Sequence, residues 1–72
     1  MSQRERVLGH LEAHGDITSL EAINDYGITR LSAVIFNLRD EGYNIRTKME
    51  RGVNRFGEET HFARYILEEE EL

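Results

Sequence analysis

The chain contains no cysteine and no proline, and it has only three histidines in 72 residues. Without cysteine no disulfide can hold the fold together, so stability must come from packing, from local sequence signals or from a partner subunit. A zinc site would have to use the scattered histidines and carboxylates, which lack the usual paired-ligand spacing. The absence of cysteine is also compatible with a reducing cytoplasm.

Long apolar runs, internal repeats and linkers are missing as well. No segment is long enough to cross a membrane, and the N-terminus has no apolar signal-peptide core, so we expect a cytoplasmic protein without membrane contacts. A chain this short buries only roughly 60% of its unfolded surface, which suits a small binding module better than a catalytic cleft. We therefore expect one domain over residues 1–67 and a disordered acidic tail over residues 68–72.

The net charge of −5 is distributed unevenly along the chain. Residues 1–25 carry a net charge of −3, residues 26–57 a net charge of +3, and residues 58–72 a net charge of −5. The local field over a surface, rather than the total charge, decides how a polyanion docks. The basic middle segment is therefore the part of the chain that we expect to meet nucleic acid.

Two capping boxes of the type Ser/Thr-x-x-Glu, at Ser2 and Thr18, predict the starts of helices over residues 3–14 and 19–25. Gly15 stands where a left-handed cap ends the first helix. The apolar residues expected on the inner faces of these two helices are Val7, Leu8, Leu11, Leu20 and Ile23.

A third helix is predicted over residues 30–41, with Thr29 as its cap and a glycine after it. The segment before it has the features of a helix-turn-helix joint. Gly27 allows a positive φ at the turn, Ala22 is small enough for two helices to approach closely, and Ile28 is expected to lie buried between them.

After residue 42 the hydrophobic period changes from helical to alternating. Residues 43–50 predict a half-buried strand, and residues 60–67 predict the strand that returns beside it. One side of the first strand is expected to carry Tyr43, Ile45, Thr47 and Met49. Residues 51–59 are predicted as a flexible loop, and Ile17 as a short strand at the hairpin's edge. This order predicts an α+β winged helix-turn-helix fold: three helices and a two- or three-stranded antiparallel hairpin wing.

Helical geometry divides the third helix into two faces. The core stripe is predicted to be Leu31, Val34, Ile35 and Leu38. The opposite face supplies the residues we expect to read DNA bases: Thr29, Arg30, Ala33, Phe36 and Asn37. Arginine can pair with guanine edges, asparagine with adenine, and an apolar surface with the thymine methyl group. For Phe36 the alternative is packing under the wing or the first helix, and Asp40 is expected to lie outside the contact.

A basic wing over residues 50–59 can lie along the DNA backbone or enter the minor groove. The residues of the wing and of the strand leading into it that are expected to contact the backbone are Arg46, Lys48, Arg51, Asn54 and Arg55. The alternative is that these charges only prevent the hairpin edge from pairing with other strands. Ser19 and the amides that start the second helix can also hold a phosphate.

The histidines suggest no chemistry. His10 and His14 are four residues apart on one helix, which makes at most half of a metal site. No nucleophile–base arrangement and no glycine-rich phosphate loop is present, so we expect no cofactor, no metal and no enzymatic activity.

The runs Ile17–Ile23, Gly27–Ala33 and Glu41–Ile45, with Asn54–Gly57 and Ala63–Tyr65 in the wing, resemble the small winged helix-turn-helix proteins common in phages and prophages. The resemblance covers nearly the whole chain except the acidic tail. It implies a DNA-binding fold and, by analogy, regulation of transcription. Two departures from that family are Val34 and Asp40, which stand where basic residues are common.

Two alternatives to a monomer that binds DNA stay open. A homodimer would read two half-sites, with the first helix and the last strand as candidate surfaces. Alternatively, the fold is a protein-interaction module, such as a phage-encoded inhibitor of a host nucleic-acid-processing protein. The acidic balance favours this alternative, and the basic middle segment favours double-stranded DNA.

Overall fold

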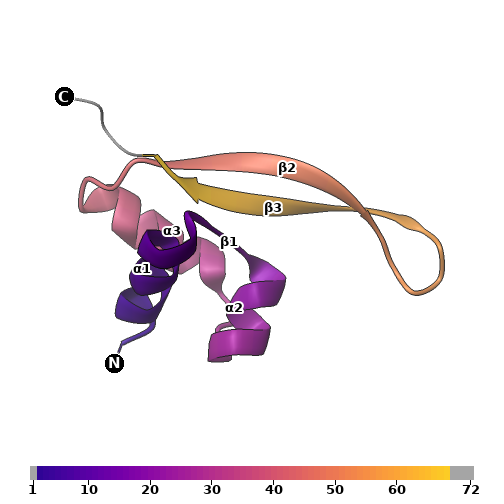
Figure 1. Cartoon of the computed structure of the whole chain (residues 1–72), viewed down its shortest axis with the longest axis horizontal. Helices are drawn as coiled ribbons and strands as arrows, with labels where there is room; N and C mark the ends of the chain where they lie inside the picture. The colour runs from indigo at the N-terminus through magenta and orange to yellow at the C-terminus, as the bar shows by residue number, and fades with distance from the viewer. Residues whose placement is uncertain (1, 69–72) are drawn as a thin grey trace.

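The structure, a computed structural model that describes residues 2–68, has three helices and one three-stranded antiparallel sheet (Figure 1), which confirms the predicted architecture. The helices are α1 (Gln3–His14), α2 (Ser19–Tyr26) and α3 (Leu31–Asp40). The strands are β1 (Asp16–Thr18), β2 (Ile45–Val53) and β3 (Glu59–Leu67). The helices gather under one end of the sheet, and β2 and β3 continue past them as a projecting hairpin, the wing. No helix among residues 2–68 is both long and apolar enough to cross a membrane.

The N-terminal caps predicted for α1 and α2 form. Ser2 Oγ accepts a hydrogen bond from the Glu5 amide at 3.2 Å. At α2 the box is complete, because Thr18 Oγ1 accepts from the Glu21 amide and the Glu21 carboxylate accepts from the Thr18 amide at 3.1 Å. Local side chains therefore satisfy amides that a helix start leaves without partners.

The Glu21 carboxylate makes the stability of this cap depend on pH. Burial alone would raise its pKa, but hydrogen bonds from the Thr18 hydroxyl and amide outweigh that effect and lower the pKa below the ordinary value of 4.5. A lowered folded-state pKa contributes stability above the unfolded pKa, and this contribution is lost as pH falls through the folded value. We expect wild type to be more stable than Glu21→Gln at pH 7, and the difference to shrink steadily below about pH 4.5.

Urea unfolding of both proteins from neutral to acid pH measures this difference. Glu12→Gln is the matched control, because within the described chain the exposed Glu12 side chain has no hydrogen bond or ion pair. A stability gap for Glu21→Gln that stays constant through the acid range would contradict the assignment.

β3 is the central strand, antiparallel to both β1 and β2. The short strand predicted at Ile17 is confirmed: Ile17 lies opposite Tyr65. The wing strands are longer than predicted, since pairing continues to Val53 opposite Glu59 and leaves only residues 54–58 as the loop.

The end of the described chain is also held by hydrogen bonds. The Glu68 amide donates to the Asn44 carbonyl at 2.8 Å, and the Glu68 carboxylate accepts from Arg46. The rest of the predicted tail, residues 69–72, lies outside the described residues.

The core forms where the helices meet the base of the sheet. The predicted stripe of α3 is confirmed, because all four residues are buried, from 0% exposure at Leu38 to 7% at Val34. The joint between α2 and α3 is also as expected. Ile28 and Ala22 are buried, and Gly27 ends α2 with a φ of 68°. In that left-handed conformation any other residue would be strained.

The predicted inner face of α2 is wrong. Leu20 is 66% exposed and Ile23 is 46% exposed, whereas Ala22 is completely buried. The side of α2 that carries Ala22 and Tyr26, four residues apart, faces α1, and the Tyr26 hydroxyl lies 2.8 Å from His10 Nδ1. A small side chain at the contact lets the two backbones approach, so the larger residues are turned outward.

The half-buried character predicted for the first wing strand holds only at its start. Ile45 is buried, but Thr47 is exposed and Met49 is 63% exposed. The helices lie under the base of the sheet, and β2 extends past them, so residues further along the same side of β2 lie beyond the helices (Figure 1).

Candidate nucleic-acid interface

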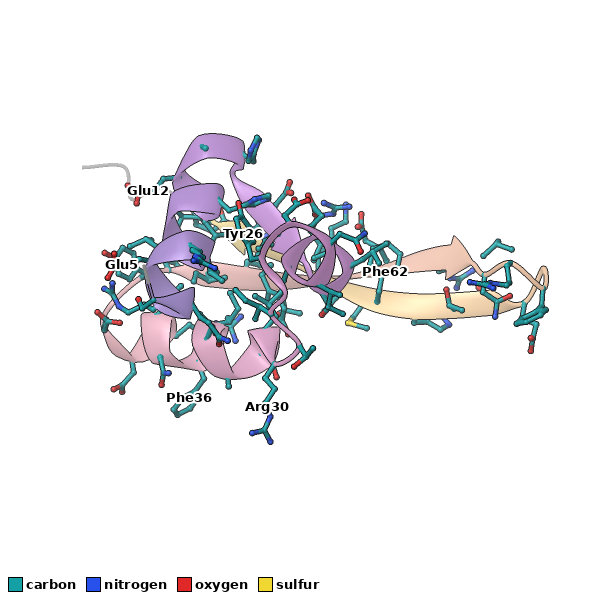
Figure 2. All side chains as sticks on the ribbon, turned by 90° about the horizontal axis from the view of Figure 1, so that it is seen from below. Glu5, Glu12, Tyr26, Arg30, Phe36 and Phe62 are labelled. Carbon is teal, nitrogen blue, oxygen red and sulfur yellow. The ribbon has the colours of Figure 1, made fainter. Side chains whose placement is uncertain are left out.

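The outer face of α3 is uncovered along its length. All five residues predicted to read bases, from Thr29 to Asn37, are exposed, and Phe36 is 69% exposed. Arg30 and Phe36 point to the same side, away from the other helices and the sheet, whereas Glu5 and Glu12 lie on a different side, on α1 (Figure 2). The alternative of Phe36 packed under the wing or α1 is therefore wrong. Ser32, which sequence reasoning missed, is exposed on this face too; its spacing of four residues from Phe36 was the available signal.

Arg30 stands exposed at the start of this face. Within residues 2–68 its guanidinium forms no ion pair, and the same holds for Arg55 in the wing. A free cation at this position keeps its full attraction for an anionic partner. The exposed Asp40 lies three turns away, at the opposite end of α3.

The predicted cap of α3 is wrong. The N-cap is Arg30 rather than Thr29, and no side chain caps the helix. The helix starts at Leu31, one residue later than predicted, so Thr29 lies outside the position from which a hydroxyl reaches the first free amides. Its side chain is instead exposed beside Arg30.

Most cations along the wing strands already have carboxylate partners. Arg46 pairs with Glu68, Lys48 lies 3.9 Å from Glu50, and Arg51 lies 3.4 Å from Glu59. All three cations are nevertheless more than half exposed, so water screens these pairs and each is weak. A phosphate can compete for such a cation at a modest cost.

The wing tip is shaped by Asn54. Its side-chain oxygen accepts hydrogen bonds from the Phe56 amide at 2.9 Å and the Glu58 amide at 3.0 Å. Both bonds use the side-chain oxygen, whereas the predicted contact with a DNA phosphate would use the side-chain NH2 group, which is the donor. Arg55 and Phe56 stand exposed on the loop that Asn54 holds in place.

Ser19, the predicted phosphate ligand, lies exposed at the first residue of α2. The structure puts a carboxylate at this helix start: Glu21 accepts from the Thr18 amide and hydroxyl. A second anion there would meet the charge of Glu21, so this helix start is poorly suited to phosphate.

Two arginines that sequence reasoning left unassigned hold the interface together. Arg39 Nε donates to the Ile45 carbonyl at 2.9 Å, its Nη2 donates to Thr47 Oγ1 at 2.8 Å, and its guanidinium carbon lies 5.9 Å from the centre of the Tyr65 ring. These contacts join α3 to both wing strands. The only sequence signal was a cation in the last turn of the predicted helix.

Arg64 lies between three carboxylates, those of Glu50 at 2.6 Å, Asp16 at 3.0 Å and Glu21 at 3.7 Å. The hydrogen bond to Glu50, and then the one to Asp16, raise the pKa of Arg64. This arginine connects β1, α2 and β2 to β3 and is therefore part of the scaffold, not of the exposed interface.

His10 takes a structural place in the core. His10 is buried at 6% exposure between Tyr26 and His14, and its Nε2 lies 3.5 Å from Glu21 Oε2. Within residues 2–68 no group of three or more histidine and acidic side chains is arranged to hold a metal ion.

Comparison with known proteins agrees with this geometry. A family model described as a winged helix-turn-helix domain matches residues 2–70. The comparisons with curated proteins and with solved structures each give no match. Because the family match spans almost the entire sequence and the three helices and wing are in place, the chain belongs to the winged helix-turn-helix domain family.

Proposed function

We propose that this protein binds double-stranded DNA, with α3 in the major groove and the wing against the backbone or in the minor groove. The observation that carries this proposal is the uncovered outer face of α3, where Arg30, which has no ion pair within residues 2–68, stands beside Ala33 and Asn37. A major groove about 12 Å wide admits an α-helix, and arginine and asparagine have the donor patterns that pair with guanine and adenine edges.

The wing supports the same proposal. Arg55 is exposed at its tip without an ion pair in the described chain, and the more than half exposed Arg46, Lys48 and Arg51 follow the strands behind it. Phosphate contacts of this kind supply much of the affinity of DNA-binding proteins without reading sequence.

A narrower role rests on the sequence resemblance. We propose that the protein regulates transcription by binding an operator, as expected of the phage and prophage proteins that the sequence resembles, and that it acts in the cytoplasm. One α3 and one wing cover a short site, so a homodimer on two half-sites would gain specificity.

The test is a titration of fluorescently labelled duplex DNA, followed by anisotropy. We expect binding at about 50 mM salt and a steep loss of affinity toward about 200 mM, because each phosphate contact releases counterions. Absence of duplex binding at the lower salt concentration would overturn the proposed function.

Replacing Arg55 with alanine should weaken binding to every duplex by a similar factor and reduce the salt slope by about one, because a phosphate contact carries no sequence information. Arg46→Ala is the comparison variant: Glu68 already engages that guanidinium, so a smaller effect is expected. Titrations of two unrelated duplexes at several salt concentrations measure both effects. A loss confined to one sequence would place Arg55 at base edges instead.

A second candidate function, docking of a protein partner, is favoured by one observation. A half-open cleft of about 370 Å³ between the start of α2 and β3 is lined by Leu20, Phe62, Glu21 and Arg64, among others. Three carboxylates share the single Arg64 guanidinium beside it, so the cleft suits an apolar side chain flanked by basic residues. This function is supported if a protein partner is still captured after nuclease treatment. Leu20→Asp should then lose the partner and keep DNA binding. Capture that nuclease abolishes would exclude it.

A further inference from the structure

Phe36 is the only large apolar side chain on the outer face of α3. It is 69% exposed, and it points away from the body of the protein (Figure 2). Ala33 lies three residues before it, and residues three apart on a helix are neighbours. The two side chains form an apolar spot in the middle of a face whose other exposed members are polar or charged: Thr29, Arg30, Ser32, Asn37 and Asp40.

Folding does not account for this phenylalanine. The core of α3 is complete without it, since Leu31, Ile35 and Leu38 are at most 2% exposed on the opposite side. Within residues 2–68 nothing covers the ring, and a large exposed aromatic side chain gains burial only when a partner arrives. The partner in the proposed function is the floor of the major groove.

The major groove offers one protruding apolar group, the 5-methyl of thymine, which no other base pair presents. From this match, and resting on the proposed function, we propose that Phe36, with Ala33 beside it, reads thymine by burying its 5-methyl group. The small Ala33 lets the helix backbone approach the base edges, and the Phe36 ring then reaches over the methyl group. Asn37, the next residue along the helix, is exposed and has the donor and acceptor that adenine requires.

The experiment compares alternating d(A-T) and alternating d(A-U) duplexes. The two polymers present the same hydrogen-bonding groups and differ only in the 5-methyl group of the pyrimidine. Wild-type protein should bind the d(A-T) duplex more tightly, by about fourfold for each methyl group that becomes buried. In Phe36→Ala the ratio should fall toward one. Because the ring is exposed, this substitution should leave the thermal unfolding midpoint unchanged, which confirms that the variant folds.

Arg55→Ala is the matched control. It should weaken binding to both duplexes equally and keep the ratio of the wild type, because phosphates are identical in the two polymers.

Each outcome decides a separate point. If wild type binds neither duplex at about 50 mM salt, the proposed function fails, and this inference fails with it. If wild type binds both equally, or if Phe36→Ala keeps the preference for d(A-T), methyl reading by Phe36 is wrong while DNA binding stands. Unchanged DNA binding in Phe36→Ala would show that the ring makes no contact with DNA and would overturn methyl reading by Phe36.

Discussion

Replacing Leu38 with alanine is expected to destabilise the fold by about 2–5 kcal/mol. Leu38 is completely buried at the centre of the α3 stripe, where it packs in the cluster that joins the helices to Ile45 of β2. The substitution removes three buried carbons and leaves a cavity that the neighbouring side chains fill only in part. A chain of this length has a total unfolding free energy of roughly 4–11 kcal/mol, so the variant should be close to unfolded at 37 °C.

Urea unfolding followed by circular dichroism measures the loss. The control is Leu20→Ala, the same substitution on α2 at a side chain that is 66% exposed, where the change should stay within about 0.5 kcal/mol. Equal losses for the two leucines would show that α2 packs through Leu20 and would contradict the described orientation of that helix.

The second large effect is expected at the base-reading face. Arg30→Ala and Asn37→Ala should each weaken binding to a preferred duplex by about five- to 150-fold, the range for loss of one good base contact. Asn37→Ala removes no charge, so its binding to random duplex should hardly change. Arg30→Ala should weaken random binding as well, because it removes a cation that no carboxylate in the described chain neutralises.

A preferred duplex comes from repeated selection of bound sequences out of a random pool, and competition titrations then give the ratio of preferred to random binding for each variant. Arg6→Ala is the matched control for Arg30, being an exposed arginine on α1 that also has no ion pair among the described residues. If Arg6→Ala reduces the ratio as much as Arg30→Ala does, the reading surface is not the outer face of α3.

Features set by residues close in sequence were predictable. The capping residues Ser2 and Thr18 and the joint at Gly27 depend on groups within a few positions of each other, and the structure has all three as expected. The inward and outward sides of α3 follow from helical period alone. The start of α3 could not be predicted in the same way. Thr29 is a typical N-cap residue, but the N-cap in the described chain is Arg30, whose side chain forms no capping hydrogen bond.

Features set by residues far apart in sequence were not predictable. An alternating pattern shows which side of β2 carries Met49, but it does not show how far the helices extend beneath that side. The pairing of cations depends on strand register. Val53 lies opposite Glu59, which brings Glu59 diagonally beside Arg51. Glu50 lies opposite Phe62, which brings Glu50 diagonally beside Arg64. Sequence reasoning therefore counted every arginine of the wing as available, whereas most have partners.

The contacts of Arg39 have a consequence for the selectivity of the proposed DNA binding. Since this side chain ties the last turn of α3 to Ile45, Thr47 and Tyr65, the spacing between helix and wing is already set in the unbound protein. Because α3 and the wing are already held in place, the protein loses little conformational entropy when both contact DNA. A duplex whose grooves fit that spacing is then bound without rearrangement of the protein. A duplex that does not fit must itself bend, and the sequence-dependent stiffness of DNA then adds to the selectivity.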